Sequence, residues 1–425
     1  MTDLSCGCAD DRRTTMTRRG VLGRALAAGA AGAFAGLAGD QVSTQLAFAA
    51  TRYTGDTLVL LSLRGGFDGL SAIVPAGDPD YYAARPDIAV PKSQLIGGSG
   101  RFGLHPALAP LLPFWKAGTF GAVHAVGQAA PNRSHFSAME ELERAAPGTS
   151  VRTGWLDRML GGLGATSPLQ GVSVGSMMPA RVLSGPVPAL GMKSINEFAL
   201  SADQDGQPMA ATLEALYSGA PAVLSRPAGQ VMSSLAATRA LAAPAYQPAN
   251  GAVYPDDALG RALKDVARLI KGRAGLMTAC IDSGDWDIHE NLGAAVPGKR
   301  MHDKLAGLAT ALAAFAKDLG STGMKRVTLV TVSEFGRRVR QNGSQGLDHG
   351  YGNAMLLLGG GVVGGKVHGR WPGLAERYLV DGDLAVTTDY RAVIGEILHK
   401  RCGLASTRSV FPNVRSTTSG VVRAR

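Results

Sequence analysis

Residues 57–63 read TLVLLSL, and residues 64–69 directly after them read RGGFDG. The first stretch is a short continuous apolar run, which is typical of a strand buried on both faces of a sheet. The second stretch ends that run with two glycines and polar groups. We therefore predict a strand over residues 57–63 whose carboxyl end carries Arg64 and Asp68.

The same pattern continues along the chain. Further strands are predicted over residues 120–126, 276–281, 327–332 and 354–358, and helices over residues 108–117, 134–145, 154–163, 259–270, 302–319 and 390–402. Strands that alternate with helices favour an α/β fold, with a mostly parallel central sheet and helices on both faces. Residues 196–275 lack a clear strand, so we predict a helical insertion there.

Composition excludes several classes of protein. Of the 425 residues, 45% are hydrophobic and 18% charged, which excludes a disordered chain. The net charge of +10 is scattered and aromatic residues make up only 6%, so we expect anionic small-molecule or polymer substrates and no nucleic-acid partner. After residue 49 only Cys280 and Cys402 remain, which excludes a disulfide scaffold and favours two buried thiols over a bridge.

The first 49 residues have the pattern of a targeting segment. Residues 17–22 read TRRGVL, a weakly apolar stretch follows to about residue 37, and residues 47–49 read AFA. This pattern predicts a twin-arginine signal with a cleavage site, and therefore export to the periplasm or beyond. A membrane anchor is the alternative, but Arg24 and several glycines make a poor bilayer span. No transmembrane segment is expected in residues 50–425, which we predict to form the α/β domain.

Metal-ligating residue types gather next to the predicted strands. Residues 282–289 read DSGDWDIH, residues 333–337 read SEFGR, and residues 347–350, just before a strand, read LDHG. Proteins with such a sheet bind their ligands at the carboxyl ends of the strands. Carboxylates and imidazoles bind zinc, manganese and similar ions. We predict a site for a divalent cation, be it zinc, manganese, calcium or magnesium, formed by Asp68, Asp287, His289, Glu334, Asp348 and His349.

Each of these residues also has a structural interpretation. Asp68 is suited to cap a turn and Asp287 to cap a helix. Glu334 is placed to pair with Arg337, and His349 to be a hydrogen-bonded loop histidine. The prediction of a shared site therefore depends on the residues converging, because no single motif is specific enough alone.

Residues 132–136 read NRSHF and precede a helical pattern. Ser134 is placed to cap that helix, and a hydroxyl at a helix start also lies beside backbone amides that favour an anion. A metal there could activate Ser134 as a nucleophile. Ser134, His135 and Arg337 are therefore the predicted catalytic residues, with Arg64 or Arg337 holding the anionic group of a substrate.

Several of these blocks together resemble a known family. They are RGGFDGL at 64–70, VPAGDPDYY at 74–82, LHPAL at 104–108, SHF at 134–136, GDWDIH at 284–289, SEFGR at 333–337 and DHG at 348–350. In this order, behind a twin-arginine signal, they resemble the exported family labelled domain of unknown function 1501. The resemblance extends from about residue 57 to the C-terminal helix.

That family is in turn similar to the alkaline phosphatase and sulfatase superfamily, which implies an alkaline-phosphatase-like fold. By this likeness Asp68 matches a metal-bound carboxylate after the first strand, Ser134 the nucleophile, Asp287 with His289 a later cluster, and His349 the last histidine. Glu334 is followed by a phenylalanine where the superfamily has an Asp-His pair, so one histidine ligand is missing and His135 could substitute for it.

The resemblance implies two alternative functions. The first is an exported metal-dependent hydrolase of phosphate or sulfate esters. The second is a non-catalytic, alkaline-phosphatase-like protein that binds an envelope or extracellular partner. The retained serine, carboxylates and histidines favour the hydrolase, and the missing histidine favours the binding protein.

Overall fold

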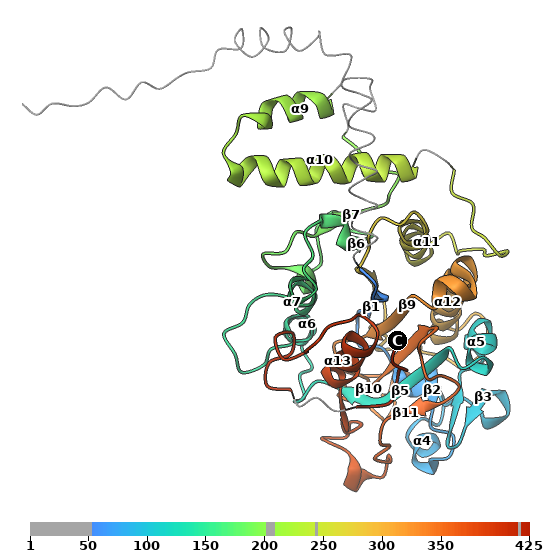
Figure 1. Cartoon of the computed structure of the whole chain (residues 1–425). Coiled ribbons are helices and arrows are strands. Elements are labelled where there is room, and N and C mark those ends of the chain that lie inside the picture. Colours follow the sequence, from blue (N-terminus) through green and yellow to red (C-terminus); the bar gives the residue numbers. More distant parts are fainter. Residues whose placement is uncertain (1–52, 201–208, 243–244, 415–417) are drawn as a thin grey trace, which may run out of the picture.

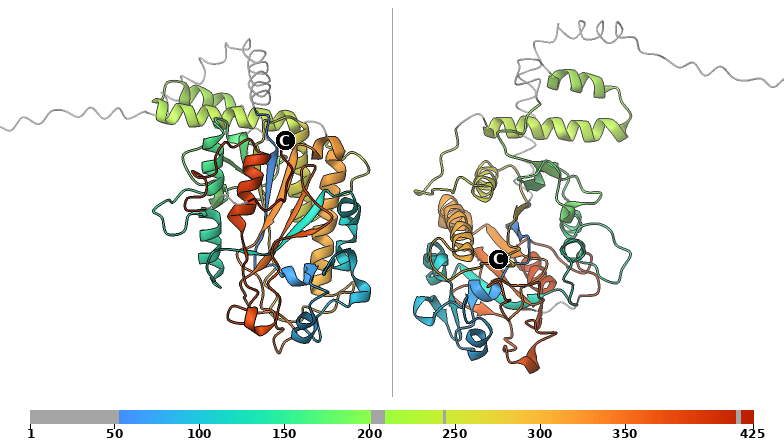
Figure 2. Two further views of the ribbon diagram at one scale, coloured as in Figure 1. Left: turned by 60° about the horizontal axis from the view of Figure 1, so that its bottom comes forward. Right: turned by 180° about the vertical axis from the view of Figure 1, so that it is seen from behind.

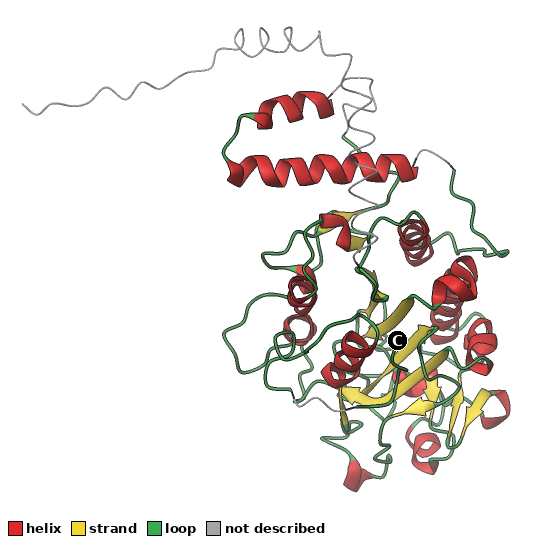
Figure 3. Ribbon diagram, viewed as in Figure 1, coloured by secondary structure: helices red, strands yellow, loops and turns green. Residues whose placement is uncertain are grey.

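The computed structural model describes residues 53–200, 209–242, 245–414 and 418–425. The predicted twin-arginine signal and cleavage site fall outside these residues. Within them the chain has a mixed α/β fold with one nine-stranded sheet and one three-stranded sheet (Figures 1 and 3). The large sheet contains β1 (Thr57–Leu63), β5 (Phe120–Gly127), β6 (Gly171–Val174), β7 (Leu190–Met192), β8 (Thr278–Ser283), β9 (Val327–Val332), β10 (Asn353–Gly359), β11 (Val367–His368) and β12 (Thr388–Asp389).

The small sheet has the order β2-β4-β3, with β2 (Ile73–Val74), β4 (Phe102–Leu104) and β3 (Ile96–Ser99). The α-helices are α3 (Gly69–Ala72), α4 (Pro79–Ala84), α5 (Leu112–Lys116), α6 (His135–Arg144), α7 (Trp155–Gly162), α9 (Met209–Ser218), α10 (Ala222–Ala242), α11 (Ala258–Lys271), α12 (Arg300–Met324) and α13 (Tyr390–Lys400). Short 3-10 helices are η2 (Lys92–Gln94), η3 (Pro106–Leu111), η4 (Pro168–Gln170), η5 (Arg181–Leu183) and η6 (Glu376–Tyr378).

The large sheet is mostly parallel. Its strand order is β11-β5-β10-β9-β1-β8-β6-β7, with β12 also paired to β5. β9, β1, β8, β6 and β7 run parallel to one another, whereas β10 is antiparallel to both β9 and β5. Because β10 runs the opposite way, its first residues lie at the edge of the sheet where β1, β8, β9 and β5 end.

Helices cover both faces of this sheet (Figure 2). Successive side chains of a strand point to opposite faces. Val59 and Leu61 of β1 belong to the core shared with α11 and α12, whereas Leu58 and Leu60 belong to the core shared with α7 and α13. Alternate side chains of β1 therefore contribute to the hydrophobic cores on both faces of the sheet.

The predicted elements agree with the structure where the apolar runs are long. β1 and β9 match the predicted strands residue for residue. The helix predicted over residues 108–117 is instead η3 followed by α5, because Pro110 lies inside η3 and a second proline opens α5, and proline removes an amide donor. Cys280 and Cys402 are free and buried, as predicted.

Residues 196–275 contain α9, α10 and α11 and no strand among their described residues. α9 and α10 lie side by side at one end of the molecule (Figure 1), where α10 packs near η4 and adds Ala237 to the core. The assignment of this region as an insertion stays a prediction. Among the described residues, every helix is too short or too polar to cross a bilayer.

Candidate functional site

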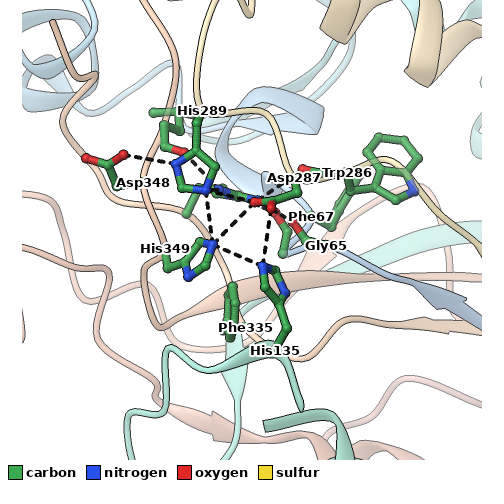
Figure 4. A network of polar contacts seen from close by, with 12 residues as sticks. Gly65, Phe67, His135, Trp286, Asp287, His289, Phe335, Asp348 and His349 are labelled. Carbon is green, nitrogen blue, oxygen red and sulfur yellow. Dashed lines mark hydrogen bonds and ion pairs between the residues drawn. The ribbon is translucent and has the colours of Figure 1, made fainter. Parts of the chain in front are cut away.

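The direction of the strands brings distant residues together at one edge of the large sheet. Asp287 and His289 follow β8, Glu334 follows β9, and His135 lies beyond β5 at the start of α6. Asp348 and His349 precede β10, which starts at the same edge because it is antiparallel to its neighbours. These six residues form a cluster that we call the histidine cluster (Figure 4): His135, Asp287, His289, Glu334, Asp348 and His349.

The Nε2 atom of His349 faces the Nε2 atoms of both other imidazoles. Nε2 of His349 lies 3.0 Å from Nε2 of His135 and 3.1 Å from Nε2 of His289. The carboxylate of Asp287 joins them, with Oδ1 2.9 Å from Nε2 of His289 and Oδ2 3.4 Å from Nε2 of His135. His135, Asp287 and His349 each offer one ligand atom, and these atoms all lie within 4.8 Å of one another.

The opposite nitrogen of each imidazole has an oxygen acceptor. Nδ1 of His135 lies 2.7 Å from Oε1 of Glu334, and Nδ1 of His289 lies 3.1 Å from Oδ1 of Asp348. Nδ1 of His349 lies 2.8 Å from the carbonyl oxygen of Arg133. Ionised carboxylates and carbonyls only accept hydrogen bonds, so each Nδ1 must donate, and in a ring with a single proton Nε2 then carries a lone pair.

Further hydrogen bonds hold the two carboxylates, of Glu334 and Asp348, that accept from the histidines. Oε1 of Glu334, which is buried, also accepts from the backbone amide of Gly65 at 2.8 Å. Oδ1 of Asp348 accepts from Nδ2 of Asn342 at 3.0 Å. The hydrogen bond from His289, followed by that from Asn342, lowers the pKa of Asp348. The ionised form of Asp348 is therefore favoured, and hydrogen bonds hold both carboxylates in the positions that orient the histidines.

Arg337 supports the cluster from inside the protein. Its side chain is 1% exposed, and its guanidinium donates to the carbonyls of Gly66 at 2.7 Å and Leu347 at 2.8 Å, to that of Gly65, and to Oδ1 of Asp287. Partial burial raises the pKa of Asp287, but the hydrogen bond and charge of Arg337 outweigh it and lower the value to about 2. Arg337 therefore lies in the site, but its donors are already used by the protein and are not free to hold a substrate.

The turn after β1 needs its two glycines. Gly65 and Gly66 have φ values of +111° and +68°, which favour glycine. A Cβ atom on Gly65 would lie 2.6 Å from the backbone nitrogen of Asp287. The turn can thus approach the loop after β8 closely enough for Arg337 to bind the carbonyls of both glycines and the Asp287 carboxylate.

Asp68 does not join the histidine cluster. Its two oxygens bind the guanidinium of the buried Arg85 at 2.6 and 3.0 Å, and Oδ2 also accepts from the amide of Ser71 at 3.2 Å. Burial raises the pKa of Asp68, but the charge and hydrogen bonds of Arg85 outweigh that effect and lower it. The structure thus places Asp68 as the cap of α3, the structural interpretation open to it from sequence, and as half of a buried ion pair, which the sequence did not indicate.

Ser134 is the N-cap residue of α6, the position predicted for it. Its side chain is exposed and makes no capping hydrogen bond. The neighbouring His135 points into the histidine cluster (Figure 4). Arg64, the other predicted anion-holding residue, is bound by Glu143 at 2.9 Å and by Asp282 at 2.7 Å.

Sequence patterns did not indicate the roles of Arg133 and Asn342. Arg133 contributes its backbone carbonyl to His349, and any residue type supplies a carbonyl. Asn342 lies in the loop before Asp348 and also donates to the carbonyl of His289 at 2.8 Å. In the sequence, only the nearness of Asn342 to the DHG motif pointed to a role in the site, and this indication is weak because asparagine is common in loops.

The arrangement has two chemical uses. The Nε2 atoms of His135 and His349 are 3.0 Å apart, and at this distance two lone pairs that face each other repel unless a proton or a cation lies between them. The cluster can therefore share a proton among its Nε2 atoms, or it can hold a cation between the nitrogens of His135 and His349 and the Asp287 carboxylate. The side chains of Asp287 and His289 are 45% and 43% exposed, so a small molecule can reach either arrangement from solvent.

A family model described as "Protein of unknown function (DUF1501)" matches residues 56–409. The chain belongs to this family. Comparison with curated proteins gives no match. The DUF1501 match covers every residue of the histidine cluster as well as Arg133, Ser134 and Arg337.

Proposed function

We propose that the histidine cluster binds one divalent cation and that the protein is an exported metal-dependent hydrolase of phosphate or sulfate esters. One observation carries the proposal. His135, Asp287 and His349 place ligand atoms within 4.8 Å of one another, both imidazoles have an oxygen acceptor on Nδ1, and His289 lies beside them with Nε2 3.1 Å from that of His349. An acceptor on the far nitrogen is the usual partner of a metal-binding histidine, because it sets the tautomer and the ring orientation.

Distances and charge support a cation. Two nitrogens bound to one zinc ion at about 2.0–2.1 Å lie roughly 3.0–3.4 Å apart, depending on geometry, and the observed separations are 3.0 and 3.1 Å. The carboxylates of Asp287, Glu334 and Asp348 all lie against the imidazoles, and a cation among the ligand atoms would offset their negative charge. Imidazole ligands favour zinc over calcium, magnesium and manganese, which oxygen ligands suit better.

The chain's own residues suit ester hydrolysis. A cation in the cluster would supply positive charge that polarises a phosphate or sulfate ester. Ser134 offers an exposed hydroxyl without a capping hydrogen bond next to His135, and is the proposed nucleophile. Glu334 holds His135 through Nδ1 at 2.7 Å, so that the ring stays directed at the cluster during the reaction.

An alkaline-phosphatase-like relationship is part of this proposal. The resemblance to that superfamily implies later Asp/His clusters, and Asp287 with His289 after β8 and His349 before β10 are the residues matched to them. Two features depart from its two-metal pattern: Asp68 is paired with Arg85, and Phe335 stands where a histidine ligand is expected. The ring of Phe335 packs 4.8 Å from the rings of His135 and His349. We therefore propose one cation, with His135 as a ligand.

The same two departures favour a second candidate, a non-catalytic protein that uses the cluster to bind an envelope or extracellular partner. Hydrolysis by one cation needs Ser134 or a water molecule as nucleophile, and the side chain of Ser134 makes no described contact with a base. Turnover separates the two candidates, because both predict a bound cation and only the hydrolase predicts product.

The test uses residues 50–425, purified and supplied with zinc or manganese. We expect about one equivalent of cation and hydrolysis of a phosphate or sulfate ester in a panel of chromogenic esters. His349→Ala should lose the cation and the activity together, whereas His302→Ala, a partly exposed histidine outside the cluster, should keep both. Wild-type protein that binds neither ion would refute the site, and a bound ion without turnover would favour the binding protein.

Export is proposed from the first 49 residues. The double variant Arg18→Lys with Arg19→Lys should accumulate as unprocessed precursor in the cytoplasm, since the twin arginine is the recognised element. The measurement is fractionation followed by detection of the precursor and mature forms. Normal processing of the double variant would contradict the assignment.

A further inference from the structure

A second charged group lies beside the histidine cluster. Asp383, 0% exposed, lies between the arginines Arg133 and Arg338. Nε and Nη2 of Arg133 both donate to Oδ2 of Asp383, the former at 3.0 Å, and Nε of Arg338 lies 3.8 Å from Oδ1. Two guanidiniums and one carboxylate leave a net charge of +1. We call these three residues the arginine pair and its carboxylate.

Both arginines are tied through their backbones to the cluster. The carbonyl of Arg133 accepts the hydrogen bond from Nδ1 of His349 at 2.8 Å. The amide of Arg338 donates to the carbonyl of Asp348 at 3.0 Å. Arg133 also directly precedes Ser134 and His135 in the chain. The backbones of both arginines are therefore hydrogen-bonded to the segment that carries Asp348 and His349.

Part of the Arg133 guanidinium is not hydrogen-bonded to the described residues of the chain. Asp383 engages its Nε and Nη2, and Nη1 has no hydrogen-bond partner in the described part of the chain. The side chains of Arg133 and Arg338 are 36% and 39% exposed. Arg337, in contrast, is buried with its donors bound to the protein. Arg133 thus presents a guanidinium edge with an available donor at the protein surface.

We propose that Arg133, oriented by Asp383 and flanked by Arg338, binds the anionic phosphate or sulfate group of the substrate. The inference deepens the proposed hydrolase and rests on it for the substrate class. A planar guanidinium held by a carboxylate loses less conformational freedom when it binds an oxyanion, and its fork of N–H donors matches phosphate or sulfate oxygens. Asp383 acts through Arg133 and is a positioning residue.

The experiment measures binding of inorganic phosphate and inorganic sulfate to residues 50–425, first with a chelator present and then with zinc added. Arg133→Gln should weaken binding about tenfold or more under both conditions, because a charge-assisted pair is lost. Arg340→Gln makes the same charge change at an exposed arginine two residues from Arg338 and should have little effect. Asp383→Asn keeps both arginines but loosens Arg133, so its loss should be smaller, and Arg133→Lys should recover part of the binding.

Three results would overturn the inference: wild-type protein that binds neither anion, Arg133→Gln that binds like wild type, or equal losses in Arg133→Gln and Arg340→Gln. Zinc content is the second readout. Arg133→Gln should retain wild-type zinc, and loss of zinc would mean that the variant acts by displacing the carbonyl bound to His349. If no ester is hydrolysed while Arg133→Gln still weakens anion binding, the hydrolase proposal fails and the anion site stands.

Discussion

The ion pair between Asp68 and Arg85 gives the sharpest test of how the structure assigns roles at this edge of the sheet. Arg85 is 0% exposed and donates to both oxygens of Asp68, and to the carbonyls of Val339 at 2.9 Å and Arg338 at 3.0 Å. Removing one partner of such a pair leaves a buried charge without compensation, which costs about 3–5 kcal/mol. Asparagine keeps one acceptor oxygen for Arg85, so Asp68→Asn should lie near the lower value and Asp68→Ala near the upper one.

Urea unfolding of residues 50–425 measures this loss, and metal analysis of the same samples measures the site. We expect Asp68→Asn to lower the free energy of unfolding and to leave the zinc content unchanged, because Asp68 contacts Arg85 and not the histidines. The double variant Asp68→Asn with Arg85→Gln buries no charge and should lose less than the sum of the single variants. A loss below about 1 kcal/mol, or loss of zinc at unchanged stability, would refute the structural role and restore Asp68 as a metal ligand.

Three further predictions follow from buried groups. Glu334→Gln should weaken zinc binding about 10–100-fold in a chelator competition, because a neutral amide oxygen is a weaker acceptor for Nδ1 of His135 than a carboxylate oxygen, and wild-type affinity would contradict this. Burial, the largest cause, lowers the pKa of His124 to about 4, so the unfolded chain binds a proton there that the folded chain rejects. Stability should therefore fall as pH drops from about 6.5 to 4, and His124→Gln should flatten that part of a urea-midpoint profile. Burial also raises the pKa values of Cys280 and Cys402, so a thiol reagent should label them only after unfolding, and rapid labelling of native protein would show that they are accessible.

Local sequence patterns predicted the centre of the sheet well. β1 and β9 are continuous apolar runs of seven and six residues, long enough to identify from composition alone. β6 and β7 escaped prediction because they have four and three residues, too few for any period to emerge. Their places in the sheet come from pairing with β8 and with each other, which local patterns do not encode.

The candidate site was predictable to the extent that it depends on strand ends. Asp287, His289, Glu334 and His349 meet as expected because the strands beside them are neighbours in the sheet. Asp68 follows the central strand β1 and was expected with them, but its side chain turns to Arg85, 17 residues away, and no spacing rule links those two. Pairs such as Arg133 with Asp383, 250 residues apart, lie beyond any local pattern.

Arg337 shows why an arginine at the right place in the sequence need not bind the substrate. Its guanidinium links the turn after β1, the loop after β8 and the segment before β10, through the carbonyls of Gly66 and Leu347 and the carboxylate of Asp287. To bind a substrate anion it would have to leave these buried carbonyls unpaired, and each unpaired group costs about 1–3 kcal/mol. The Arg337 guanidinium, which connects three segments of the site, therefore cannot also bind a substrate anion. We proposed Arg133 for that role because Asp383 fixes its orientation and its side chain is partly exposed with an unpaired donor.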